Sequence, residues 1–353
     1  YYPPLLNLNK FIRPDFAIFR VAELYLEPIR REYATSFFNG YGTELNVFRP
    51  GRPDWVEEDY RFWGKTLKIL RANNSKFSGY GLQPLYPSME DLIYINQWRL
   101  PHKDVYTLFS IKQEGHSGAL FRIPAREGYH VVDLWNNVDL QPKREGDDWV
   151  ISLNIDPFPK ADLGTNNEGA VGALAVLPDL LKVERKGDRL LIAALGGDKI
   201  RVWPGDPAYD KAEQVLELPV NGHDISLREH FGDFEGKFVV QLFQSDELLD
   251  QKQVFLPTGT ARLISKSERT PLAGDIPEGM VAIPAGTFTM KVTFGDNFIP
   301  NPVDYPEELV EMPSFYMDKH PVTNLQFKNF LEATHYRPLD QNNFLKHWED
   351  GAI

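Results

Sequence analysis

The spacing of hydrophobic and polar residues changes along the chain, and the changes predict how the chain is organised. The first part carries apolar residues at helical spacing between two strand-like runs. From about residue 84 onward, short segments alternate apolar and polar residues with a period of two, which is typical of half-buried strands. The last part, from residue 279, again mixes strands with a short helix. We therefore expect a β-rich multidomain protein.

The first part predicts helices and strands in turn. Apolar residues at helical spacing follow Pro14 as far as Pro28, which interrupts the helix that they predict. Residues 33–38 and 44–48 are apolar, strand-like runs. The turn signal Asn-Gly-Tyr-Gly at residues 39–42 separates them. Both runs are therefore predicted to be strands.

A second helix is the clearest element of this part. Asp54 occupies an N-cap position, and Glu57 follows it three residues later. Apolar residues then recur at helical spacing as far as Asn73. A strand, an aromatic-rich loop and a long capped helix form the repeating unit of an α/β barrel. Residues 1–80 are therefore predicted to be the terminal β/α unit of a barrel-like domain.

The middle of the chain predicts two β-sandwiches. Strand-like runs recur at intervals of roughly 8–15 residues, with turn residues between them, so residues 81–180 are predicted to form the first sandwich. Residues 157–178, rich in Pro, Gly and Asn, are interpreted as a crossing. Residues 181–265 are predicted to form a second, immunoglobulin-like sandwich with a turn at 221–224, and residues 266–278 a linker. The strand-like runs are 91–98, 104–111, 118–123, 130–134, 148–155, 181–183, 189–194, 199–202, 214–218, 236–243 and 253–256.

The C-terminal segment carries strong local signals. Thr323 stands at an N-cap position with Gln326 three residues later, so their side chains can satisfy each other's backbone N–H groups. Val322 and Phe327 are spaced for a hydrophobic staple. Residues 314–319 (SFYMDK) alternate apolar and polar side chains before this point. The pattern predicts a half-buried strand followed by a short amphipathic helix.

This segment resembles the opening of the formylglycine-generating enzyme family, also called the sulfatase-modifying-factor domain. The resemblance covers residues 279–353 and implies the first part of a C-type-lectin-like α+β domain. It departs from the family pattern at Lys291, where the family has Gly, and at an insertion over residues 295–308. In the activating enzymes of the family the catalytic residues are cysteines late in the domain. The matching residues are Met280, Val281, 283–290, 315–319, 321–324, Phe327, Phe330, Leu331, 343–345 and Trp348.

Composition narrows the classes of function. The net charge of −12 argues against nucleic-acid binding, which depends on Lys and Arg neutralising phosphates. No apolar run approaches the roughly 18–20 residues of a membrane span. The chain contains no cysteine, which excludes disulfides, thiolate nucleophiles and Cys-ligated zinc. The lack of cysteine does not fix the cellular compartment of the protein, although we favour an exported protein over a cytoplasmic one. Because the sequence begins YYPPLL and ends DGAI, we expect a fragment of a longer protein.

The carboxylates and aromatic residues of the first part suggest a sugar site. Sugar hydrolysis uses two carboxylates that face each other across the scissile bond. Glu44 is one candidate, but barrel enzymes place such groups at the ends of several strands, so a solvated rim residue is the favoured interpretation. Tyr41, Trp55 and Trp63 either line a sugar rim or belong to the core. No catalytic residue is assigned.

The sequence also leaves the binding of metals and cofactors undecided. Asp296, Asp304, Glu307 and Glu308 either bind calcium or form an ordinary solvated loop, since they lack the D-x-D-x-D-G spacing. The glycines of residues 164–172 match no phosphate-binding motif and are predicted to form a turn. Surface or capping roles are expected for the eight histidines, which lack helical metal-pair spacing, so no metal or cofactor is assigned. They are His102, His116, His130, His223, His230, His320, His335 and His347.

Two hypotheses of different classes remain. In the first, the chain is a fragment of a carbohydrate-directed protein without a complete active site. Residues 1–156 resemble the end of a glycoside-hydrolase barrel with its β-sandwich, fused to the formylglycine-generating-enzyme-like segment. In the second, the protein is a non-catalytic binder with a C-type-lectin-like surface and sandwich spacers. The expected partners are a carbohydrate or a sulfatase-type protein. By resemblance, a cysteine late in the domain would imply oxidation of sulfatase cysteines, and a histidine triad would imply a non-haem-iron enzyme. If both features are absent, the resemblance implies a binding function.

Overall fold

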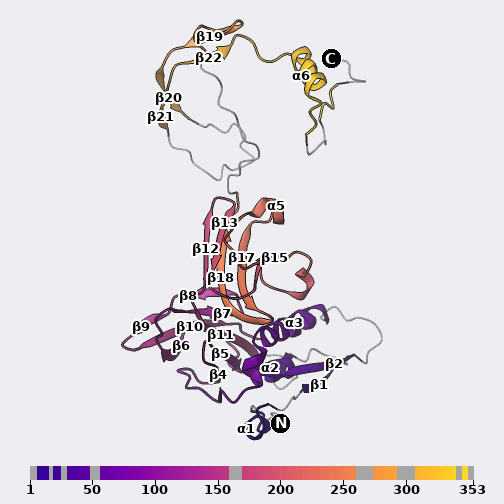
Figure 1. Cartoon of the computed structure of the whole chain (residues 1–353), viewed down its shortest axis with the longest axis vertical. Coiled ribbons are helices and arrows are strands. Elements are labelled where there is room, and N and C mark those ends of the chain that lie inside the picture. The colour runs from indigo at the N-terminus through magenta and orange to yellow at the C-terminus, as the bar shows by residue number, and fades with distance from the viewer. Residues whose placement is uncertain are drawn as a thin grey trace. The chain divides into compact units, whose positions relative to one another are not determined.

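The computed structural model describes residues 6–15, 19–24, 30–47, 56–158, 169–259, 273–291, 307–338 and 344–348. The chain divides into two compact units, Tyr1–Ile264 and Ser265–Ile353, coloured from indigo to orange and from orange to yellow (Figure 1). Sheets dominate both units, which confirms the predicted β-rich multidomain fold class. The described helices all lack the combination of length and apolar character that a bilayer span requires.

The first unit begins with a β/α unit. Strands β1 (Phe19–Leu24) and β2 (Gly42–Val47) pair in parallel, and helix α2 (Arg30–Phe38) connects them. Helix α3 (Val56–Ala72) follows, as predicted. The N-cap predicted for it, Asp54, lies outside the described residues. Two short helices flank this unit, α1 (Asn9–Ile12) and α4 (Asn74–Phe77).

Two predictions in this part are wrong. The helix predicted after Pro14 is strand β1 over its described central part, because pairing with β2 overrides the helical spacing. The strand predicted at residues 33–38 is the second half of helix α2. Nearly all residues of α2 are buried, so the helix has no polar face to mark a period of 3.6. Its sequence therefore matches the pattern of a short buried strand equally well.

The largest sheet of the first unit has six antiparallel strands in the order β3-β4-β5-β11-β7-β8. A smaller sheet has the order β6-β10-β9. The strands of these two sheets are β3 (Leu82–Gln83), β4 (Ile93–Arg99), β5 (Asp104–Ser110), β6 (His116–Pro124), β7 (Tyr129–Asp133), β8 (Val138–Leu140), β9 (Lys143–Glu145), β10 (Asp148–Ile155) and β11 (Ala170–Pro178).

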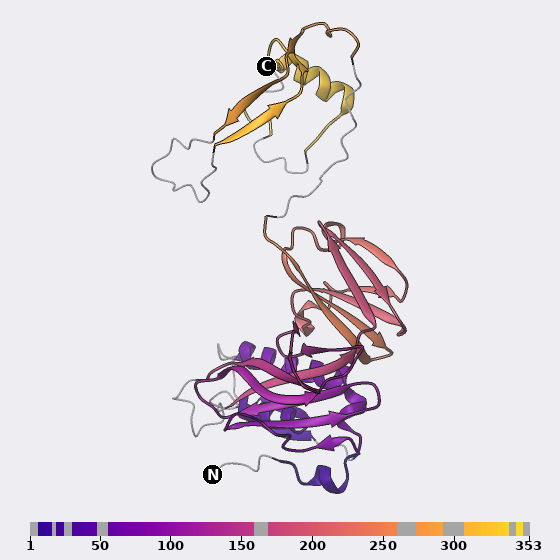
Figure 2. The ribbon, with the colours of Figure 1, turned by 90° about the vertical axis from the view of Figure 1, so that its left-hand side faces the viewer.

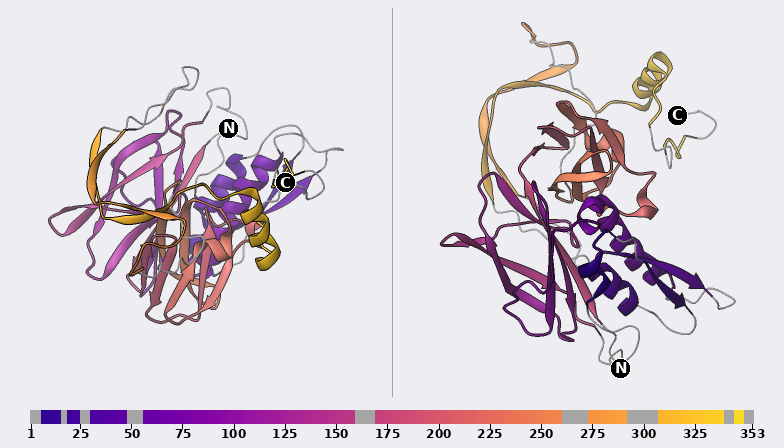
Figure 3. Two further views of the ribbon diagram at one scale, coloured as in Figure 1. Left: turned by 90° about the horizontal axis from the view of Figure 1, so that it is seen from above. Right: turned by 60° about the horizontal axis from the view of Figure 1, so that its bottom comes forward.

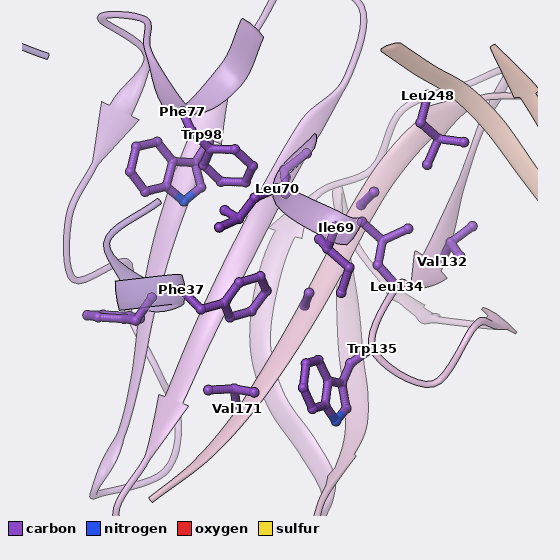
Figure 4. Close-up of a cluster of buried hydrophobic side chains, with 14 of the residues drawn as sticks. Phe37, Ile69, Leu70, Phe77, Trp98, Val132, Leu134, Trp135, Val171 and Leu248 are labelled. Atoms are coloured by element: carbon purple, nitrogen blue, oxygen red, sulfur yellow. The ribbon is translucent and has the colours of Figure 1, made fainter. Parts of the chain in front are cut away.

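The six-stranded sheet is covered on both faces. Helices α2 and α3 pack on one face through residues such as Phe37, Leu70 and Trp98 (Figure 4). Figure 3 shows both helices beside this sheet. The smaller sheet packs on the other face through a separate cluster that includes Leu108 and Phe121. A central strand between two such layers buries side chains of both faces, so it contains apolar residues without alternation.

Strand β11 illustrates this burial and corrects a further prediction. Residues 157–178 were interpreted as a crossing, and residues 164–172 as a turn, yet residues 170–178 form the strand between β5 and β7. Its residues Ala170 to Leu177 are all buried. Gly172 lies within this strand against Leu108, and residues 159–168 lie outside the described residues. The continuous apolar run ALAVLP was therefore the signal of a strand buried on both faces.

A second group of sheets follows within the same unit (Figure 2). One sheet has the order β12-β13-β16 and the other β15-β14-β17-β18, and their facing sides share one apolar core. The turn predicted at residues 221–224 is partly wrong, since His223 and Asp224 pair with β13. The elements are β12 (Leu181–Lys186), β13 (Arg189–Ala194), β14 (Lys199–Pro204), η2 (Tyr209–Lys211), β15 (Leu216–Pro219), β16 (His223–Ser226), α5 (Leu227–Phe231), β17 (Gly236–Gln244) and β18 (Glu247–Leu256).

The two groups of sheets pack against each other. Phe243 of β17 and Leu248 of β18 belong to the same apolar cluster as α3 and the six-stranded sheet. Strand β18 also contacts β8, β11 and β12. The junction is therefore part of the core of the first unit. The domain boundaries at residues 80, 180 and 265 stay predictions.

The second unit contains two strand pairs and a helix. Strand β19 (Met280–Ile283) pairs with β22 (Phe315–Asp318), and β20 (Gly286–Met290) with β21 (Glu308–Met312). The strand predicted at residues 314–319 is thus present as β22, but all residues of β22 are exposed. The expectation that it is half-buried is wrong, because no described layer covers either of its faces. Helix α6 (Asn324–Thr334) follows, as predicted.

The predicted capping box at the start of α6 is confirmed. The Gln326 backbone N–H donates to the Thr323 hydroxyl at 3.2 Å, and the Thr323 N–H donates to the Gln326 side-chain oxygen at 2.8 Å. The staple predicted between Val322 and Phe327 stays a prediction, and the Val322 side chain is 68% exposed.

Thr323→Ala is expected to lower the local stability of α6 by about 1 kcal/mol, because it removes the N-cap acceptor. Amide hydrogen exchange, followed by mass spectrometry on peptides from α6, should then become about fivefold faster. Thr323→Ser keeps the hydroxyl and should exchange close to the parent rate. Unchanged exchange in Thr323→Ala would show that the cap does not stabilise this helix.

Candidate functional site

The sugar-site candidates of the first part do not come together. Glu44 is exposed on β2 and makes no ion pair with any described residue. Trp63 packs against Tyr33 and Tyr60, with ring centroids 6.4 and 6.5 Å away, so it belongs to the core. Tyr41 is half-buried, and burial raises the pKa of its hydroxyl. Trp55 lies outside the described residues.

The acidic insertion and most histidines offer no assembled site within the described residues. Asp296 and Asp304 lie outside them, and Glu307 is exposed and pairs with Lys291 at 2.6 Å. Glu308 is the first residue of β21. Five histidines lie at exposed positions, one of them, His335, as the C-cap of α6. His116 and His223 are half-buried on strands β6 and β16, so the surface or capping role expected for them stays a prediction. The exception is His130.

His130 lies on β7 and pairs with Asp250 of β18, 120 positions further along the chain. The two side chains meet at 2.6 Å between Nε2 and Oδ1, and Asp250 is completely buried. Its Oδ2 accepts from the backbone N–H groups of Leu180 and Leu181 at 2.8 and 2.7 Å. Its Oδ1 also accepts from the Gln251 N–H at 2.6 Å. Asp250 therefore joins the two groups of sheets.

The same region also contains a cluster of three side chains of the types that bind metal ions. One ligand atom each of His130, Asp179 and Asp250 lies within 4.8 Å of the others. However, both oxygens of Asp250 already accept N–H groups, and Asp179 pairs with Lys252 at 2.8 Å. The donors satisfy these carboxylates without a cation. We therefore interpret the group as a structural ion-pair network, and no metal is assigned to it.

A cleft of about 490 Å³ provides the candidate site. It lies between helix α3 and the second group of sheets, at the junction described above. One wall is helical and cationic, and the other carries aromatic and amide side chains. The lining residues are Lys65, Lys68, Ile69, Arg71, Ala72, Asn73, Asn74, Leu134, Asn137, Arg201, Pro207, Tyr209, Gln241, Phe243, Asp246, Leu248 and Gln251.

Helix periodicity explains the cationic wall. Lys65, Lys68 and Arg71 recur every three residues, so they share one face of α3. Ile69 and Leu70, between them, are buried against the six-stranded sheet and fix the rotation of the helix. Side chains at the i and i+3 positions of this face therefore point toward the second group of sheets.

Aromatic rings hold the two lysines. The Lys65 ammonium lies 4.1 Å from the ring centroid of Trp135. The Lys68 ammonium lies 4.2 Å from the centroid of Trp203 and 5.0 Å from that of Tyr209. Such cation–π contacts hold a charge without neutralising it. The Trp203 ring is itself fixed, since its Nε1–H donates to the buried Gln241 side chain at 3.0 Å.

Burial shifts the acid–base properties of these lysines. Burial, together with the nearby Arg201 charge, lowers the pKa of Lys68 to about 8. Burial also lowers the pKa of Lys65, against the attraction of Asp206, Asp133 and Asp156. The shift has this sign because a low-dielectric surrounding disfavours the charged ammonium.

Lys68 is therefore expected to be unusually reactive toward limiting acetic anhydride at pH 8. About half of it is the neutral amine at that pH, against less than about 1% for an ordinary lysine. Acetylation mapped by peptide mass spectrometry should modify Lys68 before Lys186, whose side chain is 63% exposed. Modification of Lys186 first would contradict the lowered pKa of Lys68.

The local sequence did not reveal this site. Lys65 and Lys68 fit a solvated helix face, and Trp203 lies at the end of a strand. The cleft forms only when β14 pairs with β17 and η2 folds toward α3, which no local pattern predicts. The one available signal was the presence of lysines at i and i+3 on the face opposite the apolar stripe.

The fold and the cleft together define a β-rich multidomain protein with a cationic, aromatic-lined cleft. Its C-terminal segment has a family resemblance: residues 262–352 match the model of the "sulfatase-modifying factor enzyme 1-like domain". A formylglycine-generating enzyme of Thermomonospora curvata is 42% identical over 62 residues. That match covers 18% of this chain and 20% of the relative, so the chain spans about a fifth of its length. The resemblance predicted from the sequence is confirmed.

Three solved structures have partial similarity to this chain. Gamma-CGTase from the alkalophilic Bacillus clarkii is 12% identical with a TM-score of 0.29, over 71% of this chain and 41% of that one. The α-fucosidase of Thermotoga maritima is 16% identical with a TM-score of 0.25, over 45% and 38%. A variant of AmyP in complex with maltotriose has 11% identity and a TM-score of 0.27, over 42% and 35%.

Proposed function

We propose that this chain is part of a multidomain carbohydrate-directed protein. In it, a glycoside-hydrolase-like region is fused to a formylglycine-generating-enzyme-like segment, without a complete active site in this chain. The observation that carries the proposal is the order of parts along one chain. A β/α unit packs on antiparallel sheets, and a segment that matches the sulfatase-modifying-factor family follows.

The cleft beside α3 is the ligand site in this proposal. Its volume of about 490 Å³ is in the usual range for small-molecule sites. Its aromatic and amide side chains suit a sugar, which presents both apolar ring faces and hydroxyl groups. Tyr209 is the exposed aromatic residue of this cleft, and its hydroxyl accepts from Arg71 at 3.0 Å.

A saccharide panel tests this proposal on the whole chain. Calorimetry with neutral and acidic oligosaccharides should detect binding to at least one of them. Tyr209→Ala should weaken that binding about tenfold, because it removes an aromatic wall of the cleft. Tyr80→Ala, at a 79% exposed tyrosine that does not line the cleft, is the matched control. Lack of binding to every saccharide would overturn the proposal.

The second candidate is a non-catalytic binding protein that uses the C-terminal segment. The observation that favours it is the exposure of apolar side chains on this segment, for example Met317 at 56% and Phe315 at 40%. In this case the sheets of the first unit are spacers. A cysteine-containing sulfatase peptide should then bind and stay unmodified. Conversion of its cysteine to formylglycine would overturn this candidate.

A further inference from the structure

Neither of the two cleft lysines is paired directly with an acidic residue within the described part of the chain, although three aspartates attract Lys65 from a greater distance. Within the described part of the chain, neither Lys65 nor Lys68 makes an ion pair or hydrogen bond to an acceptor, and each ammonium contacts aromatic rings instead. Both side chains are partly buried. A partly buried charge that has lost water without gaining an anion is destabilising by itself. A ligand with a negative charge would remove this penalty.

The rest of the cleft is also cationic. Arg201 and Arg71 complete its set of four cations. Arg201 is partly neutralised by Glu217 at 2.6 Å, whereas Arg71 donates to the uncharged Tyr209 hydroxyl. Among the described residues that line the cleft, Asp246 is the one acidic residue, and it is exposed. This positive potential stands out on a chain whose net charge is −12.

We propose that the cleft binds an anionic saccharide, one that bears carboxylate or sulfate groups, and that the Lys65 and Lys68 ammonium groups contact those groups. This inference rests on the proposed function and deepens it. The rings of Trp135 and Trp203 hold the two ammonium groups in place before the ligand arrives, so less side-chain entropy is lost on binding. The amide of Asn74 at the rim is available to sugar hydroxyls.

The geometry also explains why lysine rather than a neutral donor occupies these positions. An ammonium is a compact charge with three N–H donors, which suits the oxygens of a carboxylate or a sulfate ester. Hydrogen bonds to charged groups contribute more than those between neutral groups. The lowered pKa values of Lys65 and Lys68 agree with an anionic ligand, since they indicate that the empty cleft disfavours the charged form of both side chains.

Three tetrasaccharides of equal length test this inference by calorimetry on the whole chain. Tetragalacturonate supplies carboxylates, neocarratetraose sulfate supplies sulfate esters, and maltotetraose is neutral. At least one anionic probe should bind about tenfold more tightly than maltotetraose. That preference should shrink as salt is raised, because added ions screen the attraction. Preference for one anionic probe identifies the carboxylate or the sulfate as the recognised group.

Substitutions test whether Lys65 and Lys68 recognise the anionic groups of the ligand. Lys68→Met and Lys65→Met should each weaken binding of the anionic probe about tenfold, and should weaken binding of maltotetraose much less. Lys68→Arg keeps the charge and should retain most of the preference. Lys186→Met, at an exposed lysine outside the cleft, is the matched control. Circular dichroism of each variant verifies that it is folded.

The outcomes distinguish a failure of this inference from a failure of the proposed function on which it rests. Equal affinity for maltotetraose and both anionic probes would overturn the anionic ligand while leaving a carbohydrate-directed protein. An anionic preference that survives Lys65→Met and Lys68→Met would also overturn the inference. Inorganic sulfate that binds as tightly as the sulfated probe would reduce the site to an ion site and overturn it. Lack of binding to all three probes would overturn both proposals.

Discussion

Asp250→Ala is expected to destabilise the first unit by about 3–5 kcal/mol, which is the range for breaking a buried ion pair. Asp250 is completely buried, and its carboxylate accepts three backbone N–H groups and contacts His130. Alanine leaves all of these donors without an acceptor in the core, and each orphaned buried donor costs about 1–3 kcal/mol. Urea unfolding followed by tryptophan fluorescence measures the loss.

Two further variants separate the buried acceptor from the charge. Asp250→Asn keeps one side-chain oxygen for the Leu180 and Leu181 N–H groups, so it should recover part of the loss. Asp179→Asn removes the neighbouring carboxylate, which is 51% exposed and pairs with Lys252. An exposed pair is worth about 0–1 kcal/mol, so this control should stay close to the parent. Equal losses in Asp250→Ala and Asp179→Asn would refute the structural role of Asp250.

The parts of the fold that sequence patterns predicted are those with one exposed face. Strands β10 and β13 alternate buried and exposed residues, so a period of two revealed them. Helix α6 was predicted from its capping box, because a cap is a contact between residues three positions apart. Signals of this kind are local and do not depend on the rest of the chain.

The failures have the opposite cause. Helix α2 and strand β11 are covered on all sides, so neither carries a polar face that would reveal its period. In β11, burial on both faces gives a uniform apolar run in place of an alternating pattern. In α2, polar residues such as Arg31, Thr35 and Ser36 are buried together with apolar ones, so polar positions do not mark an exposed face. The α2 carbonyl of Phe38 accepts from the side chains of Asn96 and Thr107, which lie far along the sequence. Long-range contacts of this kind complete the helix end, and no window of sequence contains them.

The cleft depends on the same long-range contacts. Its walls come from α3 and from strands more than a hundred positions later, and their register places Trp203 and Tyr209 against Lys68. The residue types alone are compatible with an ordinary solvated helix face. Only the packed junction turns that face into a cationic wall. Buried polar contacts hold this junction together, among them those of Asp250 and Lys103.

Lys103→Met is expected to destabilise the first unit by about 3–5 kcal/mol and to weaken ligand binding in the cleft. Lys103, on the turn before β5, is only 3% exposed. Its ammonium donates to the Asn73 side chain at 2.7 Å, contacts the backbone carbonyl of Leu248, and pairs with Glu247 at 2.8 Å. Asn73 and Leu248 both line the cleft, so Lys103 holds its two walls together.

Urea unfolding measures the stability of Lys103→Met, and calorimetry with the tightest saccharide probe measures its affinity. The double variant Lys103→Met, Glu247→Gln should recover part of the stability, because it also removes the carboxylate charge that Lys103 no longer neutralises. The affinity should not recover with it, since neither substituted side chain can bridge Asn73 to Leu248. Lys252→Met removes the ammonium from a partly exposed pair and should change stability by no more than about 1 kcal/mol. An affinity that is unchanged in Lys103→Met would show that the cleft keeps its walls without this contact.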